Sequence, residues 1–179
     1  MEYAIVYLLR KEAGNYHKLL VRKLAKRFNE NYLISSPIPS HATLKYPFKA
    51  KRLEEIENML KKFCKKQSPA KIKIRKVKHF REQIIYLDLE FSRKALMIYR
   101  DLKKQLRHIS WLIWRAHDKL ENKFHSTLIY GNSPKTFKRI WKYVSNLKPT
   151  FDIELDNISI LIKKRKYWKL FKTYEITNR

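Results

Sequence analysis

Two short stretches of the sequence repeat one pattern of residues that can move protons and hold phosphate. SHATLKYPF, which contains His41 and Thr43, is followed 84 residues later (125 − 41) by FHSTLIYGN, which contains His125 and Thr127. An imidazole can accept or release a proton near neutral pH, and a hydroxyl can donate to a phosphate oxygen. Two such pairs in one site suit the cleavage of a phosphodiester, with one imidazole as base and the other as acid. A ribonucleoside 2′,3′-cyclic phosphate suits such a site, because attack and departure occur on opposite sides of phosphorus.

Each pattern is expected to lie on a β-strand, which places the histidine and the threonine on one face. Side chains at positions i and i+2 of a strand point the same way. His41 therefore projects with Thr43, and His125 with Thr127, while the leucine after each threonine points into the layer behind. The proposed chemistry needs a fold that brings the two strands together.

The elements around the two patterns recur in the same order, which indicates a duplicated unit. Each half is expected to contain a strand, a helix, the His-x-Thr strand, a second helix and a further strand. The predicted ranges outside the motifs are strands 3–9, 71–80, 83–91, 151–162 and 167–176 and helices 15–29, 53–66, 92–109 and 134–144. We expect a single bilobal domain over residues 1–179, with lobe-forming halves of approximately 1–80 and 81–179 and the active-site cleft between them.

Local patterns add detail to three of these elements. Residues 15–29 repeat apolar side chains at helical spacing and carry basic residues on the other face, where His17 is expected as a surface residue. Residues 71–80 alternate apolar and basic side chains, which predicts a half-exposed strand with a basic face. Ser92 is a plausible N-cap for the following helix, whereas residues 110–123 are ambiguous.

The charge of the chain favours a polyanionic partner. Its 179 residues include 42 Lys and Arg against 16 Asp and Glu, a net charge of +26. Nucleic acid is the first candidate, although a lysine-rich surface without a partner is the simpler alternative. Cys64 is the only cysteine, which excludes an intrachain disulfide. No stretch reaches the length of a membrane span, so we expect a cytoplasmic protein, and we expect it to be a monomer.

The two motifs in this arrangement resemble those of the 2H phosphoesterase superfamily, which includes 2′-5′ RNA ligases and RNA 2′,3′-cyclic phosphodiesterases. The resemblance implies an α+β fold of two pseudo-symmetric lobes, each with an antiparallel sheet and flanking helices. It implies His41 and His125 as the catalytic pair and Thr43 and Thr127 as the phosphate-holding residues, with no metal or cofactor. The implied substrate is RNA or a small nucleotide with a cyclic phosphate or a 2′-5′ linkage.

One departure from the family pattern concerns the substrate. Many family members have Arg two residues after the second motif's leucine, where this chain has Tyr130. By alternation, Tyr130 is expected to face away from Thr127 and to pack. Lys45, expected on the face of His41, could supply the missing cation, with a solvated edge lysine as the alternative. Trp168, which follows the basic turn 163–166, is a candidate for stacking on a base.

Three other functions remain open from the sequence. The enzyme could act on 2′-5′ or cyclic signalling oligonucleotides, which the motifs do not separate from RNA ends. A non-catalytic module that binds RNA or nucleotides is a second alternative, disfavoured by the intact motifs. His117 could complete a three-histidine metal site with the motif histidines, although zinc sites usually show tighter spacing.

Overall fold

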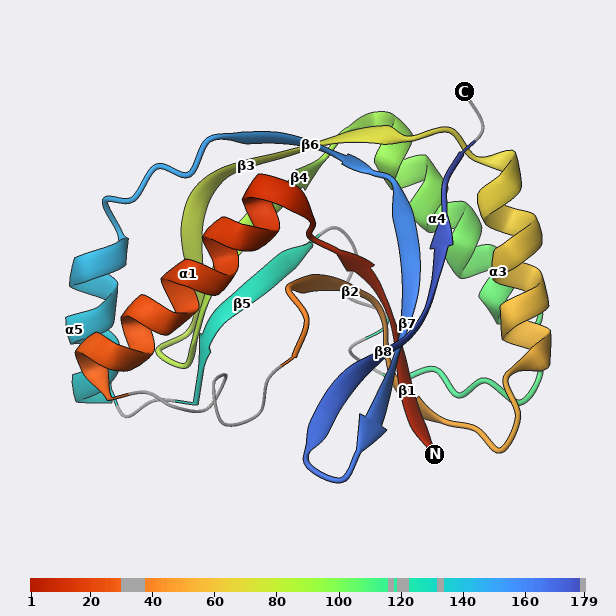
Figure 1. The fold of residues 1–179 in the computed structure, drawn as a ribbon, viewed down its shortest axis with the longest axis horizontal. Helices are drawn as coiled ribbons and strands as arrows, with labels where there is room; N and C mark the ends of the chain where they lie inside the picture. Colours follow the sequence, from red (N-terminus) through yellow and green to blue (C-terminus); the bar gives the residue numbers. More distant parts are fainter. Residues whose placement is uncertain (30–37, 116–117, 119–122, 132–133, 178–179) are drawn as a thin grey trace.

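The computed structural model describes residues 1–29, 38–115, 118, 123–131 and 134–177. Two four-stranded antiparallel sheets and their flanking helices form two lobes (Figure 1), which confirms the predicted α+β fold. The strands are β1 (Glu2–Leu8), β2 (His41–Lys49), β3 (Ala70–Phe80), β4 (Ile84–Phe91), β5 (His125–Tyr130), β6 (Phe151–Leu155), β7 (Asn157–Lys164) and β8 (Tyr167–Glu175). The helices are α1 (Lys11–Phe28), α3 (Glu54–Lys66), α4 (Arg93–Arg107) and α5 (Pro134–Val144).

Each His-x-Thr motif lies on an edge strand of its own sheet. The first-motif sheet has the order β2-β1-β7-β8, and the second-motif sheet has the order β5-β4-β3-β6. The motif strand is therefore at the edge in both sheets, beside the strand that opens its half of the chain. This equivalence agrees with the duplicated unit that the sequence indicates.

The lobes are not the contiguous halves 1–80 and 81–179, so that prediction is wrong. Strand β3 pairs with β4 and β6 in the second-motif sheet, whereas β7 and β8, from the end of the chain, complete the first-motif sheet. The predicted strand 151–162 is likewise two strands, β6 and β7, which belong to different sheets. Alternating hydrophobicity identifies a strand but not its partner, because any strand with one apolar face fits either sheet.

The helices bury the apolar faces that the sequence predicts, and in α1 the buried face also includes His17. Helix α1 buries a stripe that recurs at steps of three or four residues, formed by Ala13, Gly14, His17, Leu20, Val21, Leu24 and Ala25. Ser92 caps α4, because its side-chain oxygen accepts a hydrogen bond from the backbone N–H of Ala95. One hydrophobic cluster contains buried side chains of both sheets, including Ile5, Ile72 and Ile160. This shared core holds the two motif strands in a defined relation.

Candidate active site

The two motif histidines are held in the same way. The Nδ1–H of His41 donates to the carbonyl of Pro39 at 2.7 Å, and the Nδ1–H of His125 donates to the carbonyl of Lys123 at 3.0 Å. A carbonyl oxygen can only accept, so each neutral ring carries its proton on Nδ1 and an accepting lone pair on Nε2. Within the described part of the chain, Nε2 of neither ring has a hydrogen-bond partner. Both side chains are half-buried.

The charge of His125 acts on the His41 ring. Burial lowers the pKa of His41 below its ordinary value of 6.5, and the positive charge of His125 acts in the same direction. Burial also lowers the pKa of His125, while the negative charge of Asp88 opposes this shift. The motif strands β2 and β5 also contact each other, so the fold brings the two motifs close together.

A β-bulge at the leucine of each motif sets which side chains join the histidines. Thr43 is paired with Val6 and Lys45 with Ile5, so Leu44 is the additional residue. The second motif repeats this irregularity at Leu128, between the residues paired with Tyr86 and Ile85. A bulge inserts one residue and reverses the alternation beyond it. We call the face that carries the histidine and threonine of each sheet its motif face.

The first bulge overturns the prediction for Lys45. Beyond Leu44 the alternation is reversed, so Lys45 points with Ile5 into the core and is 0% exposed. Its Nζ donates to Asp118 at 2.9 Å and lies 5.0 Å from the ring centroid of Trp114. Lys45 is therefore neither a solvated edge lysine nor a ligand for a phosphate on the motif face.

The second bulge likewise overturns the prediction for Tyr130. Residues Ile129 and Ile85 are paired on the buried side, so the next pair, Tyr130 and Ile84, returns to the motif face. Tyr130 is 52% exposed and does not pack in the core. The position that carries Arg in many relatives therefore does lie on the side of Thr127, and here it presents a phenol.

Three neighbours of His125 were not singled out from the sequence. Asp88 is its paired residue on β4, so the carboxylate lies on the same motif face, where it also forms an ion pair with Lys78. The rings of Phe80 and Tyr86 lie 5.1 and 5.0 Å from the His125 ring. Beside them, a cavity of about 490 Å³ is lined by Lys78, Tyr86, Asp88, Leu89, Glu90, Phe91, Leu96, Lys123 and Phe124. The sequence offered one signal, the alternation of Tyr86 and Asp88 along a predicted strand.

His17 is buried, not on the surface as predicted. It is 6% exposed and lies in the apolar stripe of α1. Its ring bonds Ser40 at 2.8 Å and the carbonyl of Thr127 at 2.9 Å, so it contacts both motif regions. Burial lowers its pKa to about 4. The spacing of His17 from Ala13 and Leu20 was the signal in the sequence that could have placed it on the buried face.

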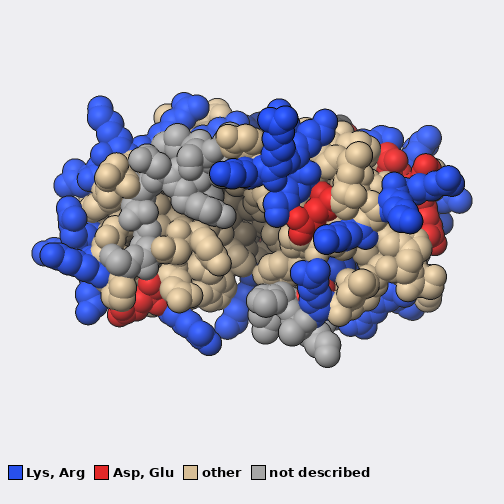
Figure 2. Space-filling model, turned by 90° about the horizontal axis from the view of Figure 1, so that it is seen from below, with Lys and Arg blue, Asp and Glu red and all other residues tan. Residues whose placement is uncertain are grey.

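Trp168 lies on the motif face of the first-motif sheet but far along it. It is paired with Lys163, which is paired with Glu2. The indole packs against the cluster formed by Ala4, Val6, Leu8 and Leu161, and the Nζ of Lys163 lies 5.9 Å from the ring centroid. Figure 2 shows the face on which the β7–β8 hairpin projects toward the viewer: it is hollowed near its middle, and Lys and Arg side chains gather beside the hollow.

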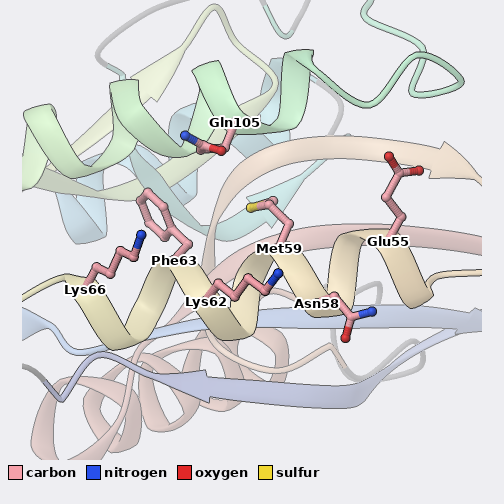
Figure 3. A pocket seen from close by; sticks show the side chains of 7 residues that line it. All are labelled: Glu55, Asn58, Met59, Lys62, Phe63, Lys66 and Gln105. Carbon is pink, nitrogen blue, oxygen red and sulfur yellow. The ribbon is translucent and has the colours of Figure 1, made fainter.

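A pocket elsewhere on the molecule contains none of the motif residues. It lies between α3 and α4 and has a volume of about 450 Å³. Figure 3 shows Met59 and Phe63 of α3 turned toward Gln105 of α4, with Glu55, Asn58, Lys62 and Lys66 around them.

His117, the candidate third metal ligand, lies outside the described residues, and those described contain no cluster of three His, Cys, Asp or Glu side chains. Among them there is also no helix long and apolar enough to cross a membrane.

Sequence comparison agrees with the geometry of the motifs. The family model of the 2′-5′ RNA ligase superfamily matches residues 19–166, which include both His-x-Thr motifs. No curated protein shows significant similarity to the chain.

Solved structures with the same fold extend over nearly the whole chain. TT0787 of Thermus thermophilus has a TM-score of 0.66 at 10% identity, with 98% of each chain covered. A structure described as a phosphoesterase has a TM-score of 0.63 at 13% identity, covering 99% of this chain and 98% of its own. E. coli LigT in complex with 3′-AMP has a TM-score of 0.60 at 12% identity, again covering 99% and 98%. At these identities the likeness shows the fold.

Proposed function

Because the chain belongs to the 2′-5′ RNA ligase superfamily, we propose that it is a metal-independent phosphodiesterase that hydrolyses 2′,3′-cyclic phosphates of RNA ends or nucleotides. The observation that carries this proposal is the matched pair of imidazoles, His41 and His125, each fixed through Nδ1 with Nε2 left for substrate. The structures of LigT with 3′-AMP, ATP and phosphate support a nucleotide substrate.

In the proposed reaction the two histidines transfer one proton each. Nε2 of neutral His41 accepts a proton from water as the water oxygen attacks phosphorus. The bond from phosphorus to one ribose oxygen breaks, and this oxygen takes the proton from Nε2 of His125. The hydroxyls of Thr43 and Thr127 donate to the non-bridging oxygens. The products are a phosphomonoester and a ribose hydroxyl; an RNA 5′-hydroxyl in place of water would give a 2′-5′ linkage when the bond to the 3′ oxygen breaks.

The surroundings of the two rings support this division of roles. Asp88 is the paired residue of His125, and a carboxylate favours the protonated imidazole. The paired residue of His41 is the apolar Leu8. A proton shared by the pair is therefore more stable on His125, which makes His125 the acid and His41 the base.

A stacking role for Trp168 requires an RNA chain rather than a free nucleotide. Strand β8 lies three strand spacings from β2, about 14 Å at about 4.8 Å each. Along the strands, Trp168 is level with Glu2 and His41 with Leu8, an offset of about 20 Å. A mononucleotide cannot reach both residues. A single strand of several nucleotides can, since stacked nucleotides advance about 3.4 Å each.

The test is turnover in EDTA by the wild-type protein and the variants His41→Ala and His125→Ala. The substrates are a 2′,3′-cyclic mononucleotide, an RNA with a 2′,3′-cyclic end and a 2′-5′ oligoadenylate. We expect hydrolysis of the cyclic phosphates and a loss of about 10²-fold or more in each variant. Turnover that survives both substitutions contradicts the two-histidine mechanism. Turnover that is lost in EDTA and restored by zinc contradicts metal independence, and cleavage of the oligoadenylate alone changes the assigned substrate.

A further inference from the structure

His17 is a buried polar group that the proposed reaction does not use. It lies in α1, 6% exposed, and its ring connects two segments that are far apart in the chain. One ring nitrogen contacts Ser40, the residue before His41, at 2.8 Å. The other contacts the carbonyl oxygen of Thr127 at 2.9 Å. The one imidazole therefore contacts both motif regions.

The partners of His17 determine its tautomer. The carbonyl of Thr127 only accepts, so Nε2 of His17 must carry the proton. In the neutral ring Nδ1 is then an acceptor, and the hydroxyl of Ser40 donates to it. Burial, reinforced by the charge of His41, lowers the pKa of His17 to about 4. The ring is thus neutral at neutral pH.

The two bonds of His17 join edges that the sheets themselves do not join. Strands β2 and β5 are edge strands of different sheets, so no ladder of backbone hydrogen bonds fixes their separation. His17 bonds the main chain of one motif strand and the residue that precedes the other. A side chain that fills this place without hydrogen bonds would leave the Thr127 carbonyl and the Ser40 hydroxyl without these bonds, in a site where they are largely removed from water.

The second half of the chain has a different contact at the equivalent place. Tyr99 is the seventh residue of α4, as His17 is the seventh residue of α1. Phe124 precedes His125 as Ser40 precedes His41. The rings of Tyr99 and Phe124 meet edge to face at 4.8 Å, so an aromatic contact stands where the first half has a hydrogen bond. The bonded histidine is therefore a feature of the first motif and not of the fold's duplicated unit.

We infer that His17 is a positioning residue of the active site, which fixes the spacing of His41 and Thr127 through its bonds to Ser40 and the Thr127 main chain. The inference rests on the proposed function, since the spacing matters for a phosphate held between the two motifs. A displacement of about 1 Å between reacting groups can cost about 10²-fold in rate.

The experiment compares four proteins on a 2′,3′-cyclic mononucleotide: wild type, His17→Phe, His17→Gln and Leu24→Ala. Phenylalanine fills the space without hydrogen bonds. Glutamine can donate to the Thr127 carbonyl and accept from Ser40. Leu24 is fully buried in the same stripe of α1, so Leu24→Ala is the control for loss of helix packing alone. Each kcat is expressed per folded molecule, measured by circular dichroism and active-fraction titration.

We expect His17→Phe to lower kcat by about 10- to 100-fold with little change in KM, and His17→Gln to recover part of this loss. Leu24→Ala should lose stability and keep its kcat. A kcat for His17→Phe within about threefold of wild type overturns the inference, because a lost positioning bond has a larger cost. An equal loss of kcat in Leu24→Ala also overturns it, because the effect then belongs to the helix.

If the wild-type protein hydrolyses no cyclic phosphate, the proposed function is refuted. The positioning role of His17 is then tested separately by ¹⁵N NMR. The ring nitrogens of His41 and the amide of Thr127 should shift in His17→Phe well beyond their shifts in Leu24→Ala. Equal shifts in the two variants overturn the inference independently of activity.

Discussion

Asp88 lies directly opposite His125 in the register of β4 and β5, on the motif face, and this pairing distinguishes two otherwise equivalent histidines. His41 has the apolar Leu8 at the corresponding position. A duplicated motif provides two similar imidazoles, but proton transfer needs one acid and one base. In the proposed reaction, the cross-strand carboxylate provides this difference.

The Asp88→Asn variant should move one limb of the pH profile. The carboxylate stabilises protonated His125, so its removal lowers the pKa of His125 further. The acid form is then lost at a lower pH, and the alkaline limb of kcat/KM shifts toward acid while the acid limb, from His41, moves little. The exposed Glu90 on the same strand gives the matched control Glu90→Gln. A shift of the acid limb instead would reverse the assigned roles.

In the wild-type protein, both limbs of the pH profile of kcat/KM should lie at a lower pH than two ordinary histidines would give. Burial lowers the pKa of His41 and of His125 from the ordinary 6.5. The bell-shaped dependence of kcat/KM on pH, measured with a cyclic mononucleotide at constant ionic strength, should therefore have its maximum below about pH 6.5. A maximum above about pH 7 would show that the free enzyme does not hold its histidines as described.

Trp168→Ala should separate RNA from mononucleotide substrates. The indole is too far along the sheet from His41 to contact a mononucleotide, so kcat/KM for a 2′,3′-cyclic mononucleotide should not change. For an oligonucleotide of about ten residues with a cyclic end, KM should rise about 5- to 150-fold, since a base stacked on an aromatic ring contributes about 1–3 kcal/mol. Tyr167→Ala, at an exposed neighbouring position, is the control. Equal effects on both substrates would place Trp168 in a structural role.

The ion pair of Lys45 and Asp118 should be far more important for stability than for catalysis. Asp118 accepts from Lys45 Nζ and from the backbone N–H groups of Tyr46 and Arg115. Asp118→Ala removes the acceptor from all three donors and should lower the free energy of unfolding by about 3–5 kcal/mol. Lys45→Met should cost less, because two donors still bond the carboxylate. Urea unfolding measures the free energy of unfolding of both variants, and Asp101→Ala, at an exposed position, is the control. A larger loss of stability in Lys45→Met than in Asp118→Ala would contradict this account.

His17 should make the protein less stable in acid. Its pKa is about 4 in the folded state against 6.5 in the unfolded chain, so between these values the unfolded chain binds more protons. The free energy of unfolding should fall as pH decreases from 6.5 to 4, by up to roughly 3 kcal/mol from this group. His41 and His125 act in the same direction, so the measurement is the difference between wild type and His17→Phe in urea at about pH 7 and about pH 4.5. An equal fall in the free energy of unfolding between these two pH values, in wild type and in His17→Phe, would contradict a contribution from His17.

The sequence was sufficient for the features that depend on local pattern. The motif strands, the amphipathic helices, the Ser92 cap and the superfamily follow from spacing and residue type, and the structure and the family match confirm them. The catalytic roles of the motif residues remain proposals.

What the sequence did not reveal depends on departures from pattern and on distant partners. Strict alternation predicts the wrong face for Lys45 and Tyr130, because the bulges at Leu44 and Leu128 reverse it. A bulge has no reliable signature in residue type, so one additional residue moved both side chains to the opposite face. The buried state of Lys45 also depends on Asp118, which lies 73 residues away in a segment without a clear pattern.

The interleaving of the sheets determines when the site can exist during synthesis. Strands β7 and β8 complete the sheet that contains β1, so this sheet can form only after the end of the chain has been synthesised. Until residues 157–175 leave the ribosome, β1 lacks one of its two neighbours and the His41 strand lacks a finished sheet. Pairing across so long a sequence separation folds slowly and exposes strand edges meanwhile. A chain that ends before β7 contains all four motif residues and yet lacks the hairpin that completes the first lobe.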